Sequence, residues 1–378
     1  MRLRAEIGLL NPLPLRHFRF LVLSCPALTV LFVLRLNLAR LIAMRQITIT
    51  SLLLFLVPFS AAQTSQRESF AHATVSYDWV VNHSGQKLRT FITRPTAAGG
   101  KVPVIFFVGW LSCDTMEYPD ANTRDGFGKF MRRLIDESGY ATMRMDKPGV
   151  GESQGDCSKA DFNSEMEGWQ AAFAALEKYD FIDSGRVFVV GLSNGGGFSP
   201  LAAGDHSVRG FVSAGSWGRT WYEHMLELER RRLTAEGRSP SEVNAAVKAF
   251  ADFYNLYLIR GMTPGQVIAQ HTEWKSLWYD TPDGQYGRPA AFYQQLQALN
   301  LGEAWQKVSA PVLVIRGGAD EIMSRADSEA IAQIVNQVHP GHARYLEVEG
   351  MDHGFTVKGK FHDDMVPLVT AWMREQLR

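Results

Sequence analysis

The sequence predicts an α/β fold, in which a mostly parallel, doubly wound sheet carries an inserted helical cap. From about residue 73 onward, short apolar runs alternate with segments of helical spacing. Several of these runs are apolar throughout, as expected for strands that helices cover on both faces. The alternation breaks between about Thr220 and Val308, where Glu, Arg, Gln and aromatic residues recur with helical spacing. We interpret that stretch as a helical insertion between two strands.

A hairpin is expected at the start of the globular region. Residues 75–81 alternate apolar and polar side chains, residues 83–86 have turn composition, and residues 88–94 run back. The next strand, at 102–108, reads VPVIFFV and is predicted to be buried. Further strands are expected at 141–145, 187–192, 211–214, 311–315 and 345–348, and helices at 127–134, 166–176, 327–338 and 365–377. Cap helices are expected at 222–236, 241–259 and 290–299.

These assignments divide the chain into a leader (1–62), a core (63–219 and 309–378) and a cap (220–308). Seven of the 39 Lys and Arg residues but one of the 39 Asp and Glu residues lie in the leader. The formal charge of zero therefore divides into +6 for the leader and −6 for the rest. No basic tract follows the leader, which gives nucleic-acid binding little support.

The leader is expected to direct export. Its two apolar stretches, at 20–34 and 47–59, are each shorter than the roughly 20 residues that span a bilayer. A basic start, the second stretch and the small residues Ser60-Ala61-Ala62 together predict a signal peptide over 44–62. The alternative is a membrane anchor that both stretches form as a hairpin. Both interpretations place residues 63–378 outside the cytoplasm, in the periplasm or secreted.

Of the three cysteines, Cys25 lies in the leader, which leaves Cys113 and Cys157 in the exported part. An even number of cysteines in an oxidising compartment favours a disulfide. Two buried free thiols are the alternative.

The segment Gly191-Leu192-Ser193-Asn194-Gly195 fits the pattern G-x-S-x-G. It directly follows a predicted buried strand, and Gly196, Gly197 and a helix-compatible stretch come next. A nucleophile elbow needs this layout, because the strand must turn sharply into a helix without side-chain collisions. A glycine-rich surface turn is the alternative, which the flanking strand disfavours. We therefore predict that Ser193 is a catalytic nucleophile.

A serine hydroxyl needs a base, and the base needs an acid that orients it. On a doubly wound sheet these groups are expected after later strands, the acid before the histidine. Asp320 follows a predicted buried strand and is the expected acid, with the adjacent Glu321 as the alternative. His353 lies in a glycine-containing loop after the last predicted strand and is the expected base.

Backbone N–H groups are expected to stabilise an oxyanion beside the serine. The Asn194 N–H at the start of the predicted helix is the first expected donor. Trp110, in the loop after the 102–108 strand, is the second, and Leu111 is the next choice. No His/Cys cluster has the spacing of metal ligands, so neither a metal nor another cofactor is expected.

Together these residues resemble the α/β-hydrolase superfamily over nearly all of residues 73–378. The resemblance rests on GLSNGG, PVLVIRGGAD, GMDHGF and the superfamily turn D-x-x-G-x-G-x-S, here DKPGVGES at 146–153. Within the superfamily the chain is most similar to secreted or periplasmic carboxylesterases with a helical cap, close to serine-aminopeptidase-like hydrolases. The resemblance implies the α/β-hydrolase fold, in which the loops of Cys113 and Cys157 emerge at one sheet edge and can be bonded.

The resemblance and the predicted triad imply hydrolysis of a small-molecule ester through an acyl-enzyme. One alternative is peptide hydrolysis like that of serine aminopeptidases, for which Glu223, Glu227 and Glu273 are candidates to bind an α-ammonium group. A catalytically silent binding protein is the other. Candidate pocket walls in the cap are Trp221, Phe253, Tyr254, Trp274, Trp278, Tyr286 and Phe292. Acyl-chain length, oligomeric state and the choice of Met1 or Met44 as the start stay open.

Overall fold

The computed structural model describes residues 67–378. The predicted leader over 1–62, whether signal peptide or membrane anchor, lies outside these described residues. Within 67–378, no helix combines the length and the apolar character needed to cross a bilayer.

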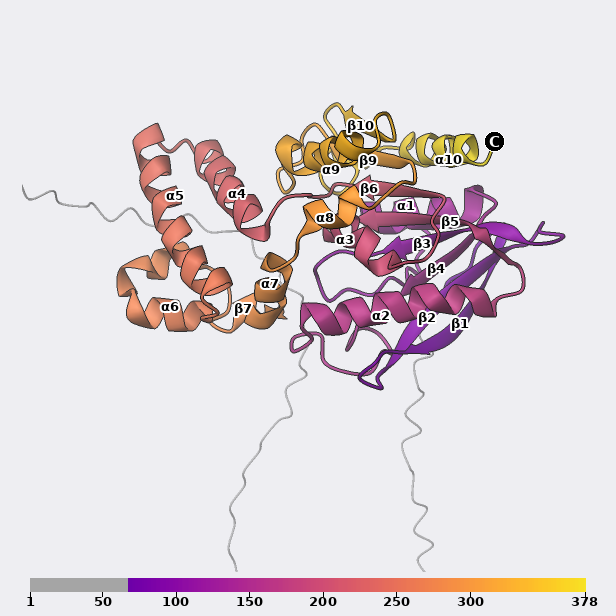
Figure 1. The fold of residues 1–378 in the computed structure, drawn as a ribbon, viewed down its shortest axis with the longest axis horizontal. Coiled ribbons are helices and arrows are strands. Elements are labelled where there is room, and N and C mark those ends of the chain that lie inside the picture. Colours follow the sequence, from indigo (N-terminus) through magenta and orange to yellow (C-terminus); the bar gives the residue numbers. More distant parts are fainter. Residues whose placement is uncertain (1–66) are drawn as a thin grey trace, which may run out of the picture. The chain divides into compact units, whose positions relative to one another are not determined.

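One eight-stranded sheet organises the described chain, with the strand order β1-β2-β4-β3-β5-β6-β9-β10 (Figure 1). The pairs β1–β2 and β2–β4 are antiparallel, and every neighbouring pair from β4 onward to β10 is parallel. The strands are β1 (Ala73–Val81), β2 (Lys87–Pro95), β3 (Val102–Val108), β4 (Ala141–Met145), β5 (Ile182–Leu192), β6 (Gly210–Ala214), β9 (Val312–Gly317) and β10 (Ala343–Val348). The predicted mostly parallel sheet is confirmed, and so is its opening hairpin.

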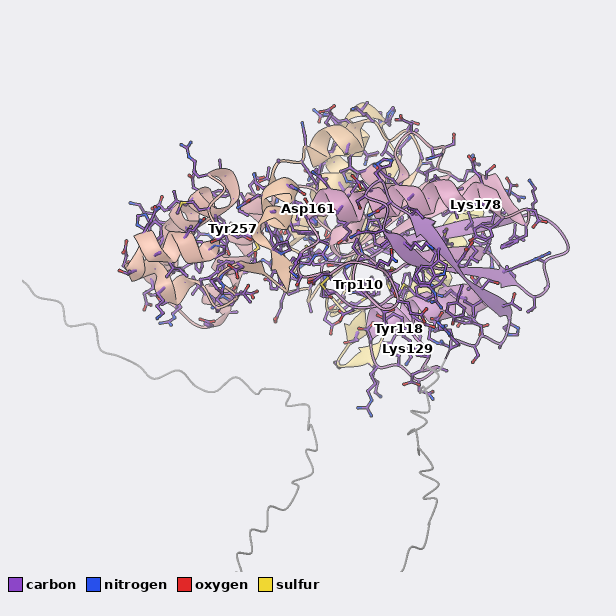
Figure 2. The ribbon with its side chains drawn as sticks, turned by 90° about the horizontal axis from the view of Figure 1, so that it is seen from below. Trp110, Tyr118, Lys129, Asp161, Lys178 and Tyr257 are labelled. Carbon is purple, nitrogen blue, oxygen red and sulfur yellow. A yellow bond between two sulfur atoms is a disulfide. The ribbon has the colours of Figure 1, made fainter. Side chains whose placement is uncertain are left out.

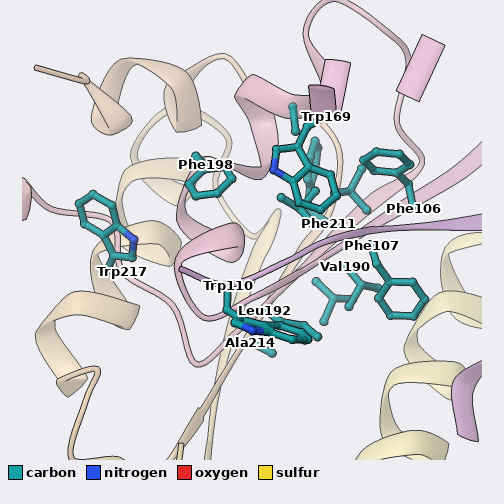
Figure 3. Packing of buried hydrophobic residues seen from close by; sticks show 14 of the residues in the cluster. Phe106, Phe107, Trp110, Trp169, Val190, Leu192, Phe198, Phe211, Ala214 and Trp217 are labelled. Carbon is teal, nitrogen blue, oxygen red and sulfur yellow. The ribbon is translucent and has the colours of Figure 1, made fainter. Parts of the chain in front are cut away.

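The central strands are apolar throughout because helices cover both sheet faces. Successive side chains of a strand point to opposite faces, as Phe106 and Phe107 of β3 do (Figure 3). The Phe106 ring packs against α2, with its centroid 6.3 Å from that of Trp169 and 5.0 Å from that of Phe173. The side chains of Phe106, Phe107, Trp169 and Phe173 are all buried. Because both faces of β3 are covered, its sequence shows no alternation of apolar and polar residues.

Helices α1 (Gly126–Glu137) and α10 (Met365–Gln376) pack together on one face of the sheet. The opposite face carries four helices in contact with one another, namely α2 (Phe162–Ala174), α3 (Asn194–Ala203), α8 (Leu301–Gln306) and α9 (Arg325–Val338). Side-chain caps fix where three of them start: Asp125 accepts from the Gly128 N–H in α1, and Asp161 and Ser324 cap α2 and α9. These starts position the loops that precede them, which lie at the carboxyl ends of the strands.

The helical insertion between β6 and β9 is confirmed. It contains α4 (Trp221–Ala235), α5 (Pro240–Tyr254), a π-turn (Asn255–Ile259), α6 (Pro264–Gln270), a 3₁₀ turn (Thr272–Leu277), α7 (Ala290–Gln297) and α8. Capping boxes at Thr220, Ser239 and Thr263 begin α4, α5 and α6. Aromatic side chains fill the interior of the insertion, among them the buried Tyr257 (Figure 2) and Phe253, whose ring stacks on Trp278 at 5.3 Å.

Two small hairpins were not predicted from the sequence. In the cap, β7 (Gly284–Gln285) pairs with β8 (Arg288–Pro289), and after β10, β11 (Thr356–Val357) pairs with β12 (Lys360–Phe361). Strands of two residues are too short to show a period, so a pattern of apolar residues could not reveal them. Both hairpins matter to the site, because one touches the cleft and the other follows the predicted base.

Candidate active site

Ser193 lies at a sharp turn between β5 and α3. Its φ of 54° and ψ of −128° place a non-glycine residue in a conformation that few L-residues adopt. Glycines on both sides make the turn possible, because a Cβ at Gly191 would collide with Ser199 and one at Gly195 with the Gly109 carbonyl oxygen. The structure therefore contains the elbow geometry that the sequence pattern predicts.

The predicted nucleophile, base and acid lie in one hydrogen-bonded chain. His353 Nε2 is 3.0 Å from Ser193 Oγ, and His353 Nδ1 is 2.9 Å from Asp320 Oδ2. Ser193 is 6% exposed and Asp320 is 3% exposed, whereas the His353 side chain is 21% exposed. The carboxylate accepts from Nδ1, so in the neutral imidazole the Nε2 lone pair faces the serine hydroxyl.

The acid loop after β9 holds Asp320 through backbone contacts. Its Oδ1 accepts from the N–H groups of Ile322 and Met323, each at 2.8 Å. The Arg316 guanidinium at the end of β9 donates to the carbonyl oxygens of Asp320 and Met323, both at 2.9 Å. Asp320 rather than the alternative Glu321 reaches the histidine, because these contacts turn its carboxylate inward.

Aromatic rings pack around the histidine. The Phe127 ring of α1 lies 5.6 Å from the imidazole and 4.8 Å from the ring of Phe355, which has a φ of 60°. Asp352 accepts from the N–H and hydroxyl of Thr356, which closes the turn into β11. These contacts keep His353 in place although its loop is partly exposed.

The loop after β3 lies directly against the elbow, as the Gly195–Gly109 contact requires. Neither the Trp110 N–H nor the Asn194 N–H donates to an acceptor within residues 67–378. The buried Lys147 ammonium holds this loop by donating to the carbonyl oxygens of Trp110 and Ser112. Two unused backbone donors thus flank the serine on the loop and at the start of α3.

A disulfide joins Cys113 in this loop to Cys157 in the loop after β4, with their Cα atoms 5.9 Å apart. The Arg288 guanidinium of the cap lies against it, donating to the Cys157 carbonyl oxygen at 3.2 Å and pairing with Glu165 of α2. The disulfide and this buried ion pair therefore connect the loop after β3, the loop after β4 and the cap.

A cleft of about 790 Å³ includes Ser193 and His353 in its lining. Most other lining side chains are apolar or aromatic and come from both core and cap: Trp110, Leu111, Tyr118, Phe127, Trp221, Leu228, Tyr286, Ile322 and Met323. Of the candidate cap walls, only Trp221 and Tyr286 line it, and the others pack elsewhere in the cap. None of Glu223, Glu227 and Glu273 lines it.

A comparison with known protein families assigns the chain to one of them. Residues 125–357, more than half of the chain, match the family described as "Serine aminopeptidase, S33". The chain belongs to this family. It is thus a hydrolase of the α/β-hydrolase superfamily, and the resemblance seen in its sequence motifs is confirmed. No curated protein shows significant similarity to the hydrolase.

Solved structures with the same fold include esterases and a peptidase. A Pyrococcus furiosus esterase, Pf2001, is 12% identical with a TM-score of 0.52, covering 81% of this chain and 92% of that one. Est1E from Butyrivibrio proteoclasticus is 16% identical with a TM-score of 0.51, covering 80% and 98%. Pyrococcus horikoshii acylaminoacyl peptidase is 14% identical with a TM-score of 0.52, covering 82% of this chain and 42% of that one.

Several lining residues of the hydrolase were missed from the sequence. Asp114 and Asp125 bring carboxylates to the cleft, and Tyr118 and Thr115 bring hydroxyls. His224 of the cap helix α4 also lines the cleft. These residues lie in loops and in the cap. They come close to Ser193 only when the chain folds, so no sequence pattern marks them.

The turn at 146–153 is bonded to the loop after β3, part of which lines the cleft. Asp146 accepts from the Met116 N–H at 2.7 Å and from the Thr115 hydroxyl. Burial raises the pKa of Asp146 to about 6, although these hydrogen bonds oppose the shift. Burial likewise lowers the pKa of the Lys147 ammonium well below its usual value.

Within residues 67–378 no group of three or more His, Cys, Asp or Glu side chains is arranged to hold a metal ion.

Proposed function

We propose that this hydrolase cleaves carboxylic esters through an acyl-enzyme formed on Ser193. The observation that carries the proposal is the hydrogen-bonded chain from Ser193 through His353 to Asp320 in the lining of an apolar cleft. A carboxylate-oriented imidazole next to a serine at a strained turn is the arrangement that activates a hydroxyl as a nucleophile.

In the first half of the reaction, Ser193 Oγ attacks the ester carbonyl carbon while His353 Nε2 takes the hydroxyl proton. Asp320 stabilises the imidazolium that forms. The N–H groups of Trp110 and Asn194 donate to the oxyanion of the tetrahedral intermediate. When the intermediate collapses, Nε2 returns the proton to the leaving oxygen and the alcohol departs.

In the second half, water attacks the carbonyl carbon of the acyl-serine. His353 Nε2 removes one water proton and then delivers it to Ser193 Oγ as the ester bond breaks. The carboxylic acid leaves, and the serine hydroxyl is restored. No cofactor enters the balance, because water supplies both the oxygen and the hydrogen that the products gain.

Peptide hydrolysis is the second candidate, since the family carries an aminopeptidase description and two carboxylates, Asp114 and Asp125, line the cleft. One oxygen of each already accepts hydrogen bonds, at Asp114 from the Ser112 hydroxyl and at Asp125 from the Gly128 N–H. The acidic cap residues considered first, Glu223 among them, do not reach the cleft. The mainly apolar lining supports an ester, and Asp114 and Asp125 are the carboxylates left to bind an α-ammonium group.

The test compares p-nitrophenyl acetate with a set of amino-acid p-nitroanilides on the purified protein. We expect a higher kcat/KM for the ester, and Ser193→Ala to lower it on the order of 10⁴-fold or more. Faster turnover of an anilide would favour the peptidase. Failure of a fluorophosphonate probe to label Ser193 in the folded protein would leave the silent binding protein as the answer.

We also propose that the hydrolase works outside the cytoplasm. The basic leader with its small residues before Gln63 supports this. The bonded pair Cys113–Cys157 supports it as well, since such bonds persist in oxidising compartments. Amino-terminal sequencing of protein from the periplasm or medium is expected to begin at Gln63. Recovery in the membrane fraction with an intact leader would favour the anchor, and recovery in the cytoplasm would contradict export.

A further inference from the structure

A second Asp–His pair lies in the same cleft. His224 of α4 is 1% exposed, and its Nδ1 is 3.1 Å from Asp327 Oδ2 of α9. His224 lines the cleft that also contains Ser193 and His353. The proposed ester hydrolysis uses neither His224 nor Asp327.

Asp327 is held firmly by other donors. Its Oδ2 accepts from the N–H and hydroxyl of Ser324 at 3.0 and 2.9 Å, and its Oδ1 accepts from two nitrogens of Arg219 at 3.0 and 2.8 Å. Because the guanidinium already compensates the carboxylate charge, Asp327 needs no second cation beside it. With Nδ1–H donated to Asp327, the lone pair of the neutral ring is on Nε2.

That Nε2 atom has no hydrogen-bond partner within residues 67–378, and His224 lines the cleft although it is only 1% exposed. Beside it, the Trp221 ring centroid lies 4.8 Å from that of His224, and Trp221 also lines the cleft. The buried indole Nε1 of Trp221 has no partner within the described chain either. An acceptor without a described partner on His224 and a buried donor without a described partner on Trp221 thus lie on neighbouring rings.

A hydroxyl group both donates and accepts, so it can satisfy the two atoms together. An ammonium group lacks the acceptor, and an ether oxygen lacks the donor. Aromatic side chains line this cleft, among them Trp110, Phe127, Trp221 and Tyr286. Flat aromatic walls favour a substrate that carries its hydroxyl on an aromatic ring.

We propose that His224 and Trp221 form a specificity site that binds the phenolic hydroxyl of an aromatic ester. The hydroxyl donates to His224 Nε2 and accepts from Trp221 Nε1, and Asp327 positions the imidazole. The proposal rests on the ester hydrolysis proposed above and adds the class of ester. A site built to bind a hydroxyl disfavours the analogue without it, since its buried polar atoms are then left unpaired.

The experiment uses matched esters in two series. The acyl series comprises methyl 3-(4-hydroxyphenyl)propanoate, its 4-methoxy analogue and methyl 3-phenylpropanoate, and the alcohol series comprises the corresponding 2-arylethyl acetates. In at least one series we expect kcat/KM for the phenol to exceed that of both analogues about tenfold or more. The difference should lie mainly in KM, as for a contact made in both ground and transition states. Equal values in both series would overturn the proposal.

The variants identify the residues. His224→Phe is expected to bring the phenol-to-phenyl ratio of kcat/KM close to one, Trp221→Phe to reduce it partly, and His224→Gln to retain part of it because the amide oxygen accepts. The matched control is His271→Phe, since His271 also stacks on a tryptophan and contacts a carboxylate but does not line the cleft. A ratio that persists in both His224→Phe and Trp221→Phe would contradict the assignment.

Calorimetry on Ser193→Ala separates this proposal from ester hydrolysis itself. If the wild type turned over p-nitrophenyl acetate but Ser193→Ala bound the phenolic and phenyl esters equally, only the specificity site would be wrong. If the wild type hydrolysed no ester and Ser193→Ala still bound the phenol more tightly, the site would stand and the proposed reaction would fail.

Discussion

Two Asp–His pairs with similar geometry lie on one cleft but face different partners. In the core pair, Asp320 holds His353, whose Nε2 meets the Ser193 hydroxyl. In the cap pair, Asp327 holds His224, whose Nε2 meets no described residue. In the functions proposed above, the same two side chains make a base where a hydroxyl is within reach and a binding group where no described side chain meets Nε2.

The supports of the two carboxylates differ as well. Backbone N–H groups hold Asp320, whereas Asp327 also pairs with the Arg219 guanidinium. Burial alone would raise the pKa of Asp327, but hydrogen bonds from His224 and Ser324 and the charge of Arg219 outweigh it and lower the pKa. Because a nearby cation already offsets the cap carboxylate, this pair is less suited to stabilising an imidazolium during a reaction.

Replacing the core acid should have the largest effect. Asp320→Asn is expected to lower kcat for p-nitrophenyl acetate on the order of 10⁴-fold. The amide neither stabilises the imidazolium nor fixes the tautomer of the neutral imidazole. Asp327→Asn serves as the matched comparison and should lower kcat far less. Equal losses in the two variants would show that the pairs do not have separate roles.

The attachment of the cap can be tested through the buried pair Arg288–Glu165, in which both side chains are almost fully enclosed. Glu165→Gln leaves the guanidinium without a counter-charge and should destabilise the protein by about 3–5 kcal/mol in urea unfolding. Replacing both residues by apolar ones of similar size, Glu165→Leu with Arg288→Met, should recover much of the loss. Glu303→Gln in the exposed pair with Lys307 is the control, with no measurable change expected.

Removing the disulfide tests how the core half of the cleft is held. The bond closes a loop with a sequence separation of 44, so Cys113→Ser with Cys157→Ser should cost about 2–4 kcal/mol in the free energy of unfolding. The loop that carries Trp110 should loosen, and kcat should fall while the acid and base stay in place. A stable variant with full activity would mean that Lys147 alone suffices to hold that loop.

The part of the cleft that the core contributes could be predicted from the sequence, because its candidate catalytic residues follow strands. Ser193 comes directly after an apolar strand, Asp320 and His353 lie in the loops after two later strands, and parallel strands bring their ends to one edge. The cap half could not, since His224 reaches the cleft through packing of α4 on the core and Tyr286 through a hairpin of two-residue strands. Even the histidine's partner, Asp327, reads in sequence as an ordinary residue in the first turn of a helix.

A pH experiment tests Asp146, the buried carboxylate that accepts hydrogen bonds from Met116 and Thr115 of the loop after β3. The pKa of Asp146 is raised to about 6, so folded protein keeps a proton that the unfolded chain releases above about pH 4. The resulting stabilisation is complete below about pH 4 and is lost as the pH rises through about 6. The stability of the wild type relative to Asp146→Asn should therefore fall by on the order of 3 kcal/mol between pH 4 and pH 7.

Asp156→Asn, in the loop that follows, is the matched control for this measurement. Hydrogen bonds from Ser158 and Lys159 lower the pKa of Asp156 to about 2, so its contribution is present above pH 4 and is lost only as the pH falls further. Its difference from the wild type should stay flat between pH 4 and pH 7 in urea unfolding. A flat curve for Asp146→Asn as well would mean that the hydrogen bonds from Met116 and Thr115 compensate burial fully.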